Sequence, residues 1–240
     1  MKKILVIVTM LFCATAFAGD FKLSNSLTQD EFSDLVQDIG LAVTPTPNSP
    51  AEPLGTLGFD IALESQFTTI DDGSGRWKHA WDDGDPDSGI LANRVHIQKG
   101  LPFGVDLGAS ITKGGNIDFT AVTIEAKYAI LEGSVITPAI SAKAAYTKVM
   151  DMDDIDLQSG LVGLYISKGF LMLTPYAGIE DVYTMASTDS DTVDLDDEDV
   201  NAVRGMVGLQ ICPFPFIVLN VEAARGGDVN QYALKAAIRF

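Results

Sequence analysis

The sequence predicts an all-β protein: a closed antiparallel transmembrane β-barrel of about ten strands, with eight or twelve as alternatives, preceded by a short amphipathic helix. Residues 230–240 alternate between apolar side chains and polar or small ones, which is typical of a strand with two unlike faces. The chain is 47% hydrophobic, yet carries 33 acidic against 16 basic residues. Amphipathic strands joined by acidic loops would keep these two characters apart.

The first residues read as a secretory signal peptide. Lys2 and Lys3 precede the apolar run Ile4–Phe12, and Ala16-Phe17-Ala18 supplies an A-x-A cleavage site, so residues 1–18 are the expected signal peptide. Bulky Phe12 argues against the alternative of lipidation at Cys13. Cleavage leaves Cys212 alone, so no disulfide within the chain is expected. No later apolar run reaches the roughly 18 residues that a transmembrane helix needs.

Residues 19–54 are predicted to form a periplasmic helix and a linker, and residues 55–240 the barrel. Thr28 and Glu31 have the spacing of a capping box, and Gly40 is expected to end the helix. One apolar stripe follows at positions i, i+3, i+4 and i+7: Phe32, Leu35, Val36 and Ile39.

A proline-rich spacer follows the helix, with prolines at 45, 47, 50 and 53, and is expected to be extended and stiff. The apolar stripe of the helix must be buried somewhere. Three placements are open: the helix plugs the barrel, caps its periplasmic mouth, or lies on the inner lipid interface.

Ten segments read as membrane-spanning strands of about 9 to 11 residues or slightly more. They are Leu57–Phe67, Ile90–Lys99, Gly104–Lys113, Ile117–Ile130, Val135–Thr147, Leu157–Ser167, Leu173–Met185, Asn201–Ile211, Phe216–Ala224 and Asn230–Phe240. The sixth and seventh alternate poorly. A closed barrel requires the first and last strands to be neighbours, with Lys235 and Arg239 across from Asp60 and Glu64.

The connections alternate between tight turns and longer, mostly acidic loops. In a transmembrane barrel the short turns face the periplasm and the long loops face outside, so an even strand number puts both termini on the periplasmic side. The phenylalanines next to the tight turns and at the C-terminus are expected to form an aromatic girdle at that interface: Phe103, Phe170, Phe214 and Phe240.

The last strand, ending on Phe240, resembles the C-terminal assembly signal of Gram-negative outer-membrane β-barrels. The resemblance implies a location in the cell outer membrane, with membrane lipid, lipopolysaccharide and the barrel assembly machinery as partners. The runs Pro53–Glu64 and Lys99–Gly104 also resemble those of an uncharacterised group of proteobacterial barrels. That second resemblance implies no substrate.

If the apolar side chains face lipid, the alternate positions place charges of both signs in the lumen. These are Asp60, Glu64, Arg94, His96, Asp106, Glu125, Lys127, Lys143, Arg204, Glu222, Lys235 and Arg239. A barrel of this size is little wider than its side chains, so the charges must pair or hold water. Three options remain for the barrel: an inert anchor, a narrow or gated passage, or a barrel with a site inside it.

The preferred function is a narrow or plugged passage for small solutes, without enzymatic activity or cofactor. One alternative is a structural or surface-interaction barrel whose acidic loops bind cations or lipopolysaccharide; those loops match no complete metal motif. Another is a hydrolase using His96, although we expect Asp106 as its near-diagonal neighbour and Ser110 nearer to Arg94. Trp77 and Trp81 are interpreted as interfacial anchors. The net charge of −17 excludes nucleic acid as a partner.

Overall fold

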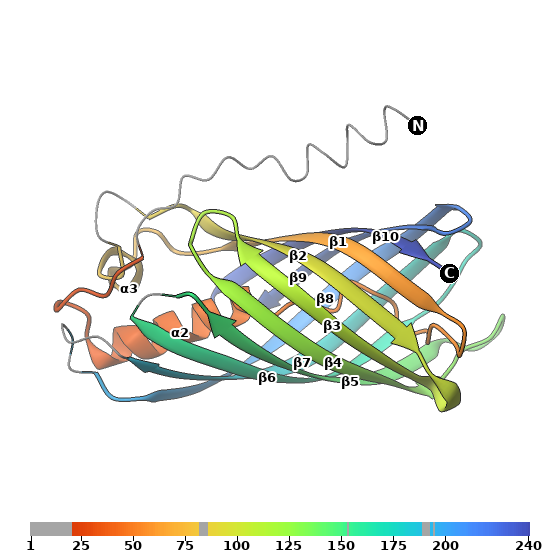
Figure 1. Ribbon diagram of the computed structural model, residues 1–240, viewed down its shortest axis with the longest axis horizontal. Coiled ribbons are helices and arrows are strands. Elements are labelled where there is room, and N and C mark those ends of the chain that lie inside the picture. Colours follow the sequence, from red (N-terminus) through yellow and green to blue (C-terminus); the bar gives the residue numbers. More distant parts are fainter. Residues whose placement is uncertain (1–20, 82–85, 153, 189–192, 194) are drawn as a thin grey trace.

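The computed structural model describes residues 21–81, 86–152, 154–188, 193 and 195–240, and shows a closed ten-strand antiparallel barrel (Figure 1). The predicted signal peptide lies outside the described residues, as does part of the acidic loop before residue 198. Each strand pairs with its neighbours in sequence. The strands are β1 (Phe59–Thr69), β2 (Gly89–Gly100), β3 (Val105–Gly114), β4 (Thr120–Leu131), β5 (Ala139–Met150), β6 (Ile155–Ser167), β7 (Leu173–Thr188), β8 (Glu198–Phe214), β9 (Ile217–Gly226) and β10 (Val229–Arg239).

The barrel closes where β1 meets β10, as the sequence predicted. In this register Asp60 lies opposite Arg239, and Glu64 lies opposite Lys235. The seam therefore joins opposite charges on the inner face, in addition to the main-chain ladder.

The strands differ from their predicted bounds by up to four residues. β7 and β8 extend further toward the long-loop end and are 16 and 17 residues long. β5 begins only at Ala139, because Ser134 and Thr137 form a hydrogen-bonded turn and Pro138 cannot donate to the ladder. Strand assignment from alternation thus found every strand but misplaced ends where turn chemistry decides.

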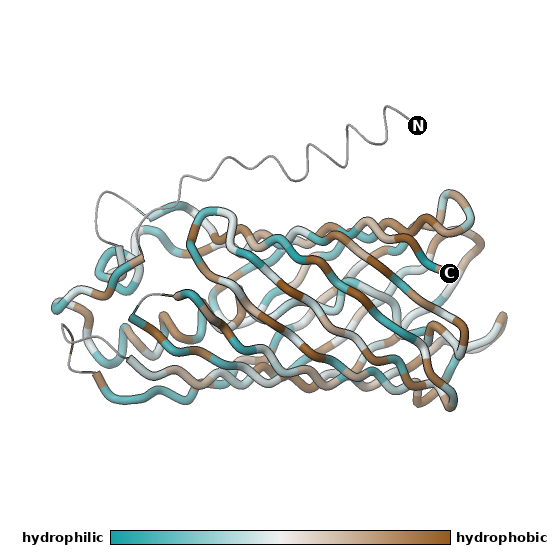
Figure 2. Tube along the Cα trace, viewed as in Figure 1, coloured by the Kyte–Doolittle hydropathy of each residue, from teal (hydrophilic) through white to brown (hydrophobic). Residues whose placement is uncertain are grey.

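The outer face of the barrel is apolar. Figure 2 shows hydrophobic and hydrophilic residues alternating along the strands. Exposed outward side chains include Ile61, Val95, Ile111, Ile124, Val162, Leu164, Ile179, Val207, Val221 and Ile238. The four phenylalanines predicted as a girdle are also exposed, between 58% and 92%. Such a continuous apolar band is unusual for a surface in water and suits contact with hydrocarbon.

Helix α2 (Gln29–Val43) begins as predicted. Thr28 caps it: its side chain accepts from the main-chain N–H of Glu31, whose carboxylate accepts from the main-chain N–H of Thr28. The prediction that Gly40 ends the helix is wrong. The helix continues for three residues because Gly40 is a packing position: a Cβ atom there would lie 2.1 Å from Oγ1 of Thr184 on β7.

Helix α2 lies inside the barrel, at the end that carries the long loops, and the C-terminus lies at the other end (Figure 1). Of the three placements left open by the sequence, the structure has the plug. Phe21 forms a bridge with Trp81 in the β1–β2 connection, whereas Phe240 pairs with Phe59 at the tight-turn end. Phe21, the first described residue, and Phe240 therefore lie at opposite ends of the barrel, because residues 28–54 thread the lumen. This differs from the expectation that both termini share one side. No helix among the described residues is long and apolar enough to cross a membrane.

Candidate functional site

The half of the lumen nearest the long loops is filled by a hydrophobic core built around helix α2. All four stripe residues are at most 1% exposed: Phe32, Leu35, Val36 and Ile39. They pack against the apolar inward side chains of the surrounding strand ends, including Ile90, Phe119, Val149 and Leu157. The stripe that the sequence left without a partner is thus buried by the barrel wall itself.

A short helix, α3 (Gly75–Lys78), covers this end of the plug. The indole N–H of Trp77 donates to Oδ2 of Asp38 over 3.0 Å, and Nε of Arg76 donates to the same oxygen over 2.9 Å. Trp77 is fully buried and Trp81 is 9% exposed. Their interpretation as interfacial anchors is therefore wrong, because both rings belong to the core of the plug.

Two carboxylates of helix α2 have perturbed pKa values, in opposite directions. Burial raises the pKa of Asp38, and the bonds from Trp77 and Arg76 oppose that rise only in part. The pKa of Glu31 is lowered, first by the main-chain N–H of Thr28 and then by His79, whose Nδ1 lies 3.1 Å from the Glu31 carboxylate.

Beyond the helix, residues 44–54 run through the remaining half of the lumen toward the tight-turn end, and residues 44–50 are all buried. Their prolines at 45, 47, 50 and 53 cannot donate hydrogen bonds, so the segment forms no regular element with the barrel. Polar side chains of the barrel wall bind its main chain instead. We call residues 44–54 the lumen segment.

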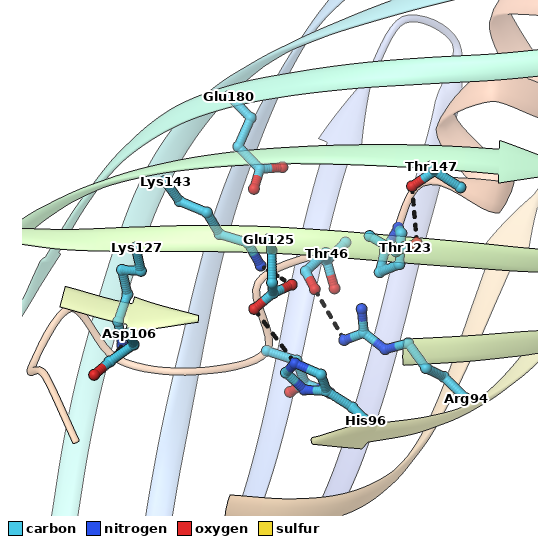
Figure 3. A network of polar contacts seen from close by, with 12 residues as sticks. Thr46, Arg94, His96, Asp106, Thr123, Glu125, Lys127, Lys143, Thr147 and Glu180 are labelled. Atoms are coloured by element: carbon cyan, nitrogen blue, oxygen red, sulfur yellow. Dashed lines mark hydrogen bonds and ion pairs between the residues drawn. The ribbon is translucent and has the colours of Figure 1, made fainter. Parts of the chain in front are cut away.

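Three buried cations bind main-chain carbonyl groups of the helix end and the lumen segment. Arg204 donates to the carbonyl oxygens of Leu41, Thr44 and Pro45 over 3.0 to 3.3 Å. Arg94 donates to the carbonyl of Thr46 over 3.3 Å (Figure 3). Lys127 donates to the carbonyls of Pro50 and Glu52 over 3.3 and 3.0 Å. These contacts satisfy groups that would otherwise be buried without partners.

Acceptors on the wall take the main-chain N–H groups of the same segment. Gln66 accepts from Thr46, Glu222 from Asn48, and Ser167 from Ala51, over 3.0 to 3.1 Å. Both carboxylate oxygens of Asp106 accept from Leu54 over 3.1 Å. Side chains of the barrel wall therefore form hydrogen bonds with main-chain donors and acceptors along almost the whole lumen segment.

The wall residues also neutralise one another. At the seam, Asp60 lies 3.1 Å from Nζ of Lys235 and 2.9 Å from Nε of Arg239. Asp106 lies 3.1 Å from Nζ of Lys127, and Glu180 lies 2.7 Å from Arg204. Isolated charges at these depths would be strongly unfavourable, so the pairing lowers the cost of burying them around the segment.

A longer chain of contacts between polar side chains crosses the half of the lumen that holds the lumen segment. Glu64 contacts Arg94, and Nδ1 of His96 lies 3.1 Å from Oε1 of Glu64. On its other side, Nε2 of His96 lies 3.3 Å from Glu125, which in turn lies 2.8 Å from Nζ of Lys143 (Figure 3). His96 is 1% exposed and bridges two carboxylates.

The expected neighbours of His96 are corrected by the register. Ser110, not Asp106, lies across from His96, and Asp106 lies opposite Gly100. The hydroxyl of Ser110 nevertheless has no hydrogen-bond partner among the described residues. Because both nitrogens of His96 face carboxylates, the side chain is placed as a bridge between Glu64 and Glu125 rather than as the base of a serine nucleophile.

All twelve charges predicted for the lumen lie in strands, and eleven are buried, whereas Arg239 is partly exposed at the tight-turn mouth. Glu180 was missed because Asp181 beside it faces outward, so the alternation of β7 gave no clear inner face. Gln66 and Ser167 were not predicted as lumen partners because they are uncharged and the prediction rested on charge. Period-two extension from Glu64 would have pointed to Gln66.

Two cavities border the lumen segment. One of about 10 Å³ lies between the segment and Arg94, Thr112 and Gln66. It has room for roughly one water molecule. The other, about 110 Å³, lies at the tight-turn mouth beside Gln98, Lys127 and Arg239. No group of three or more metal-binding side chains occurs in the part of the chain that the structure describes.

No protein-family model matches the chain, and no curated protein does. Among solved structures it is similar to the attachment invasion locus protein Ail of Yersinia pestis, solved with the heparin analogue sucrose octasulfate (14% identity, 77% of this chain and 99% of that chain, TM-score 0.37). It is also similar to the KdgM porin in complex with disordered oligogalacturonate (11%, 77% and 99%, 0.39) and to Neisserial surface protein A (12%, 75% and 95%, 0.33). These likenesses are too distant to carry an argument about function.

Proposed function

We propose that the protein is an integral barrel of a Gram-negative outer membrane that is plugged at rest by its own residues 21–54, acts as a gated passage for small solutes, and catalyses no reaction. The apolar outer face and the C-terminal strand support the location. With the tight turns in the periplasm, Phe240 lies on the periplasmic side and Phe21 on the outside.

One observation carries the proposal: the half of the lumen nearest the tight turns is closed by a segment that the wall holds through hydrogen bonds rather than by wall side chains that fill it. A neutral bond of this kind contributes only about 0.5–1.5 kcal/mol net and one to a charged side chain about 1.5–3 kcal/mol, because water can replace the partner. Once the segment leaves, the polar inner wall would line a water-filled path. Arg204, Arg94 and Lys127 would then meet solute where they now meet main-chain carbonyls.

Planar-bilayer recordings test the passage. The full chain should show no conductance steps, whereas Phe32→Asp/Ile39→Asp should show them, because two buried charges in the apolar core expel helix α2. Ser33→Asp is the matched control, since Ser33 lies on the same helix but is only half-buried. Circular dichroism must show that the strands of each variant are intact. Silence in every folded variant would refute a passage.

A surface-interaction barrel is the second candidate. The apolar core around helix α2 closes the lumen at the long-loop end, which favours this candidate because a ligand then meets only the outer surface of that end. Arg76 lies there within 3.4 Å of Asp34 and 3.6 Å of Asp228, and both carboxylates are largely exposed. Deleting residues 189–194 should reduce binding of calcium or lipopolysaccharide while leaving the fold intact. Unchanged binding of both would count against this candidate.

A further inference from the structure

The half of the lumen nearest the tight turns, which holds the lumen segment, has the properties of a peptide-binding site. We propose that it is a site for extended, proline-containing polypeptide, that the lumen segment is its intramolecular ligand, and that a peptide supplied in trans can take the place of that segment. The inference rests on the proposed function only in that the segment can leave the lumen.

The first line of support is that the wall binds main chain. Carbonyl groups are bound by Arg204, Arg94 and Lys127, and N–H groups by Gln66, Glu222, Ser167 and Asp106. Main-chain recognition supplies affinity with little dependence on the sequence of the bound strand, as in other modes of peptide capture.

The second line is that a central polar side chain of the segment is not recognised. Asn48 is 1% exposed, yet neither its Oδ1 nor its Nδ2 has a hydrogen-bond partner among the described residues. What the site requires at this position is backbone shape, because Asn48 has φ 42°, in the left-handed region. Glycine would meet that requirement without the amide.

The third line is the proline spacing of the segment. Four of its positions lack an N–H group. Three of the four N–H groups that the wall accepts come from residues between the prolines, and the fourth, from Leu54, follows Pro53 directly. Proline also lowers the entropy lost when an extended peptide is bound, since φ is already fixed. The ligand class is therefore an extended peptide with prolines two or three residues apart and Asn or Gly at the position of Asn48.

Nicking the folded full chain tests the proposal without requiring an isolated barrel to fold. The turn before β1 suits insertion of a site-specific protease sequence between Thr56 and Leu57, because Leu57 is 90% exposed. After folding in detergent micelles and cleavage, residues 21–54 should remain bound through gel filtration. A fluorescent synthetic peptide of residues 21–54 should then replace them, with the fragment appearing free in solution.

Two variants make the test specific. A peptide with Asn48→Gly should exchange within a factor of about three of the parent, since no side-chain bond is lost. In the barrel, Gln66→Met removes the bond to the Ala42 carbonyl and the bond from Thr46, so peptide should dissociate roughly 5- to 150-fold faster. Thr123→Val is the matched control, because Thr123 pairs with Thr147 and makes no bond to the segment.

Loss of the fragment during gel filtration with no uptake of peptide would overturn the proposal, and so would a fragment that never exchanges. Failure of the Asn48→Gly peptide alone would show that side chains are recognised, contrary to the main-chain argument. These results are separable from the proposed function: exchange without conductance refutes the passage but not the peptide site, and conductance without exchange does the reverse.

Discussion

Replacing Leu35 with alanine should loosen helix α2 in the lumen without opening the barrel. Leu35 is fully buried in the core formed by the helix and the surrounding strand ends. Truncating a buried leucine to alanine typically costs about 2–5 kcal/mol, with the upper values where the surroundings cannot collapse. The closed main-chain ladder of the barrel wall should prevent much collapse, so the cost should lie in the upper part of this range.

Hydrogen exchange of the helix amides, followed by mass spectrometry in detergent, measures this cost. Local opening of α2 should become roughly 400- to 5000-fold more frequent, while exchange in β1 and β10 stays unchanged. Asp30→Ala is the control, because Asp30 is exposed on the same helix. Equal acceleration in helix and strands would refute the view that the plug is a separable unit, and no acceleration anywhere would refute its tight packing.

Three further changes probe the same helix. Gly40→Ala should destabilise the plug by about 1–3 kcal/mol through contact with Thr184, and Thr184→Ala should restore part of that loss in the double variant, as read by the same hydrogen exchange. Burial raises the pKa of Asp38 above 3.8, so the stability that Asp38 contributes is full below pH 3.8 and is lost as pH rises through the raised pKa. Asp38→Asn should flatten this dependence of plug stability on pH, measured by hydrogen exchange corrected for the intrinsic effect of pH on amide exchange. An unchanged slope in the variant would contradict the role of Asp38. The lowered pKa of Glu31 acts oppositely: its stabilisation is present above 4.5 and is lost as pH falls through the lowered value. Glu31→Gln should remove that loss in unfolding measured by circular dichroism, and an equal loss in the variant would refute this role.

The barrel was predictable because alternation is a local property of each strand. Tyr232, Leu234 and Ile238 mark one face of the last strand, and closure then dictates that Asp60 meets Arg239. The apolar stripe of helix α2 was equally plain. The burial of that stripe in the lumen could not be predicted, because an apolar stripe shows which face of a helix must be buried but not which part of the protein buries it.

Other features could not be foreseen because they depend on contacts distant in sequence. Gly40 looks like a helix terminator until Thr184 is known to lie beside it. Trp77 looks like a membrane anchor until Asp38 accepts its indole N–H. Lumen charges such as Arg204 suggest a solute path from sequence, whereas in the structure they bind the main chain of the lumen segment.

The path of the segment through the barrel is the central claim, and a disulfide tests it most directly. The main-chain N–H of Ala51 donates to the Ser167 hydroxyl over 3.1 Å, so cysteines at these two positions in a Cys212→Ala chain should be close enough to link. A protease site between Thr56 and Leu57 provides the readout: after cleavage, residues 21–54 should stay attached to the barrel on a denaturing gel until a reductant is added. Cysteines at Ala51 and Ala92, which lies in the helix half of the lumen, should not link. Linkage of the second pair in place of the first, or of neither pair, would contradict the threaded path.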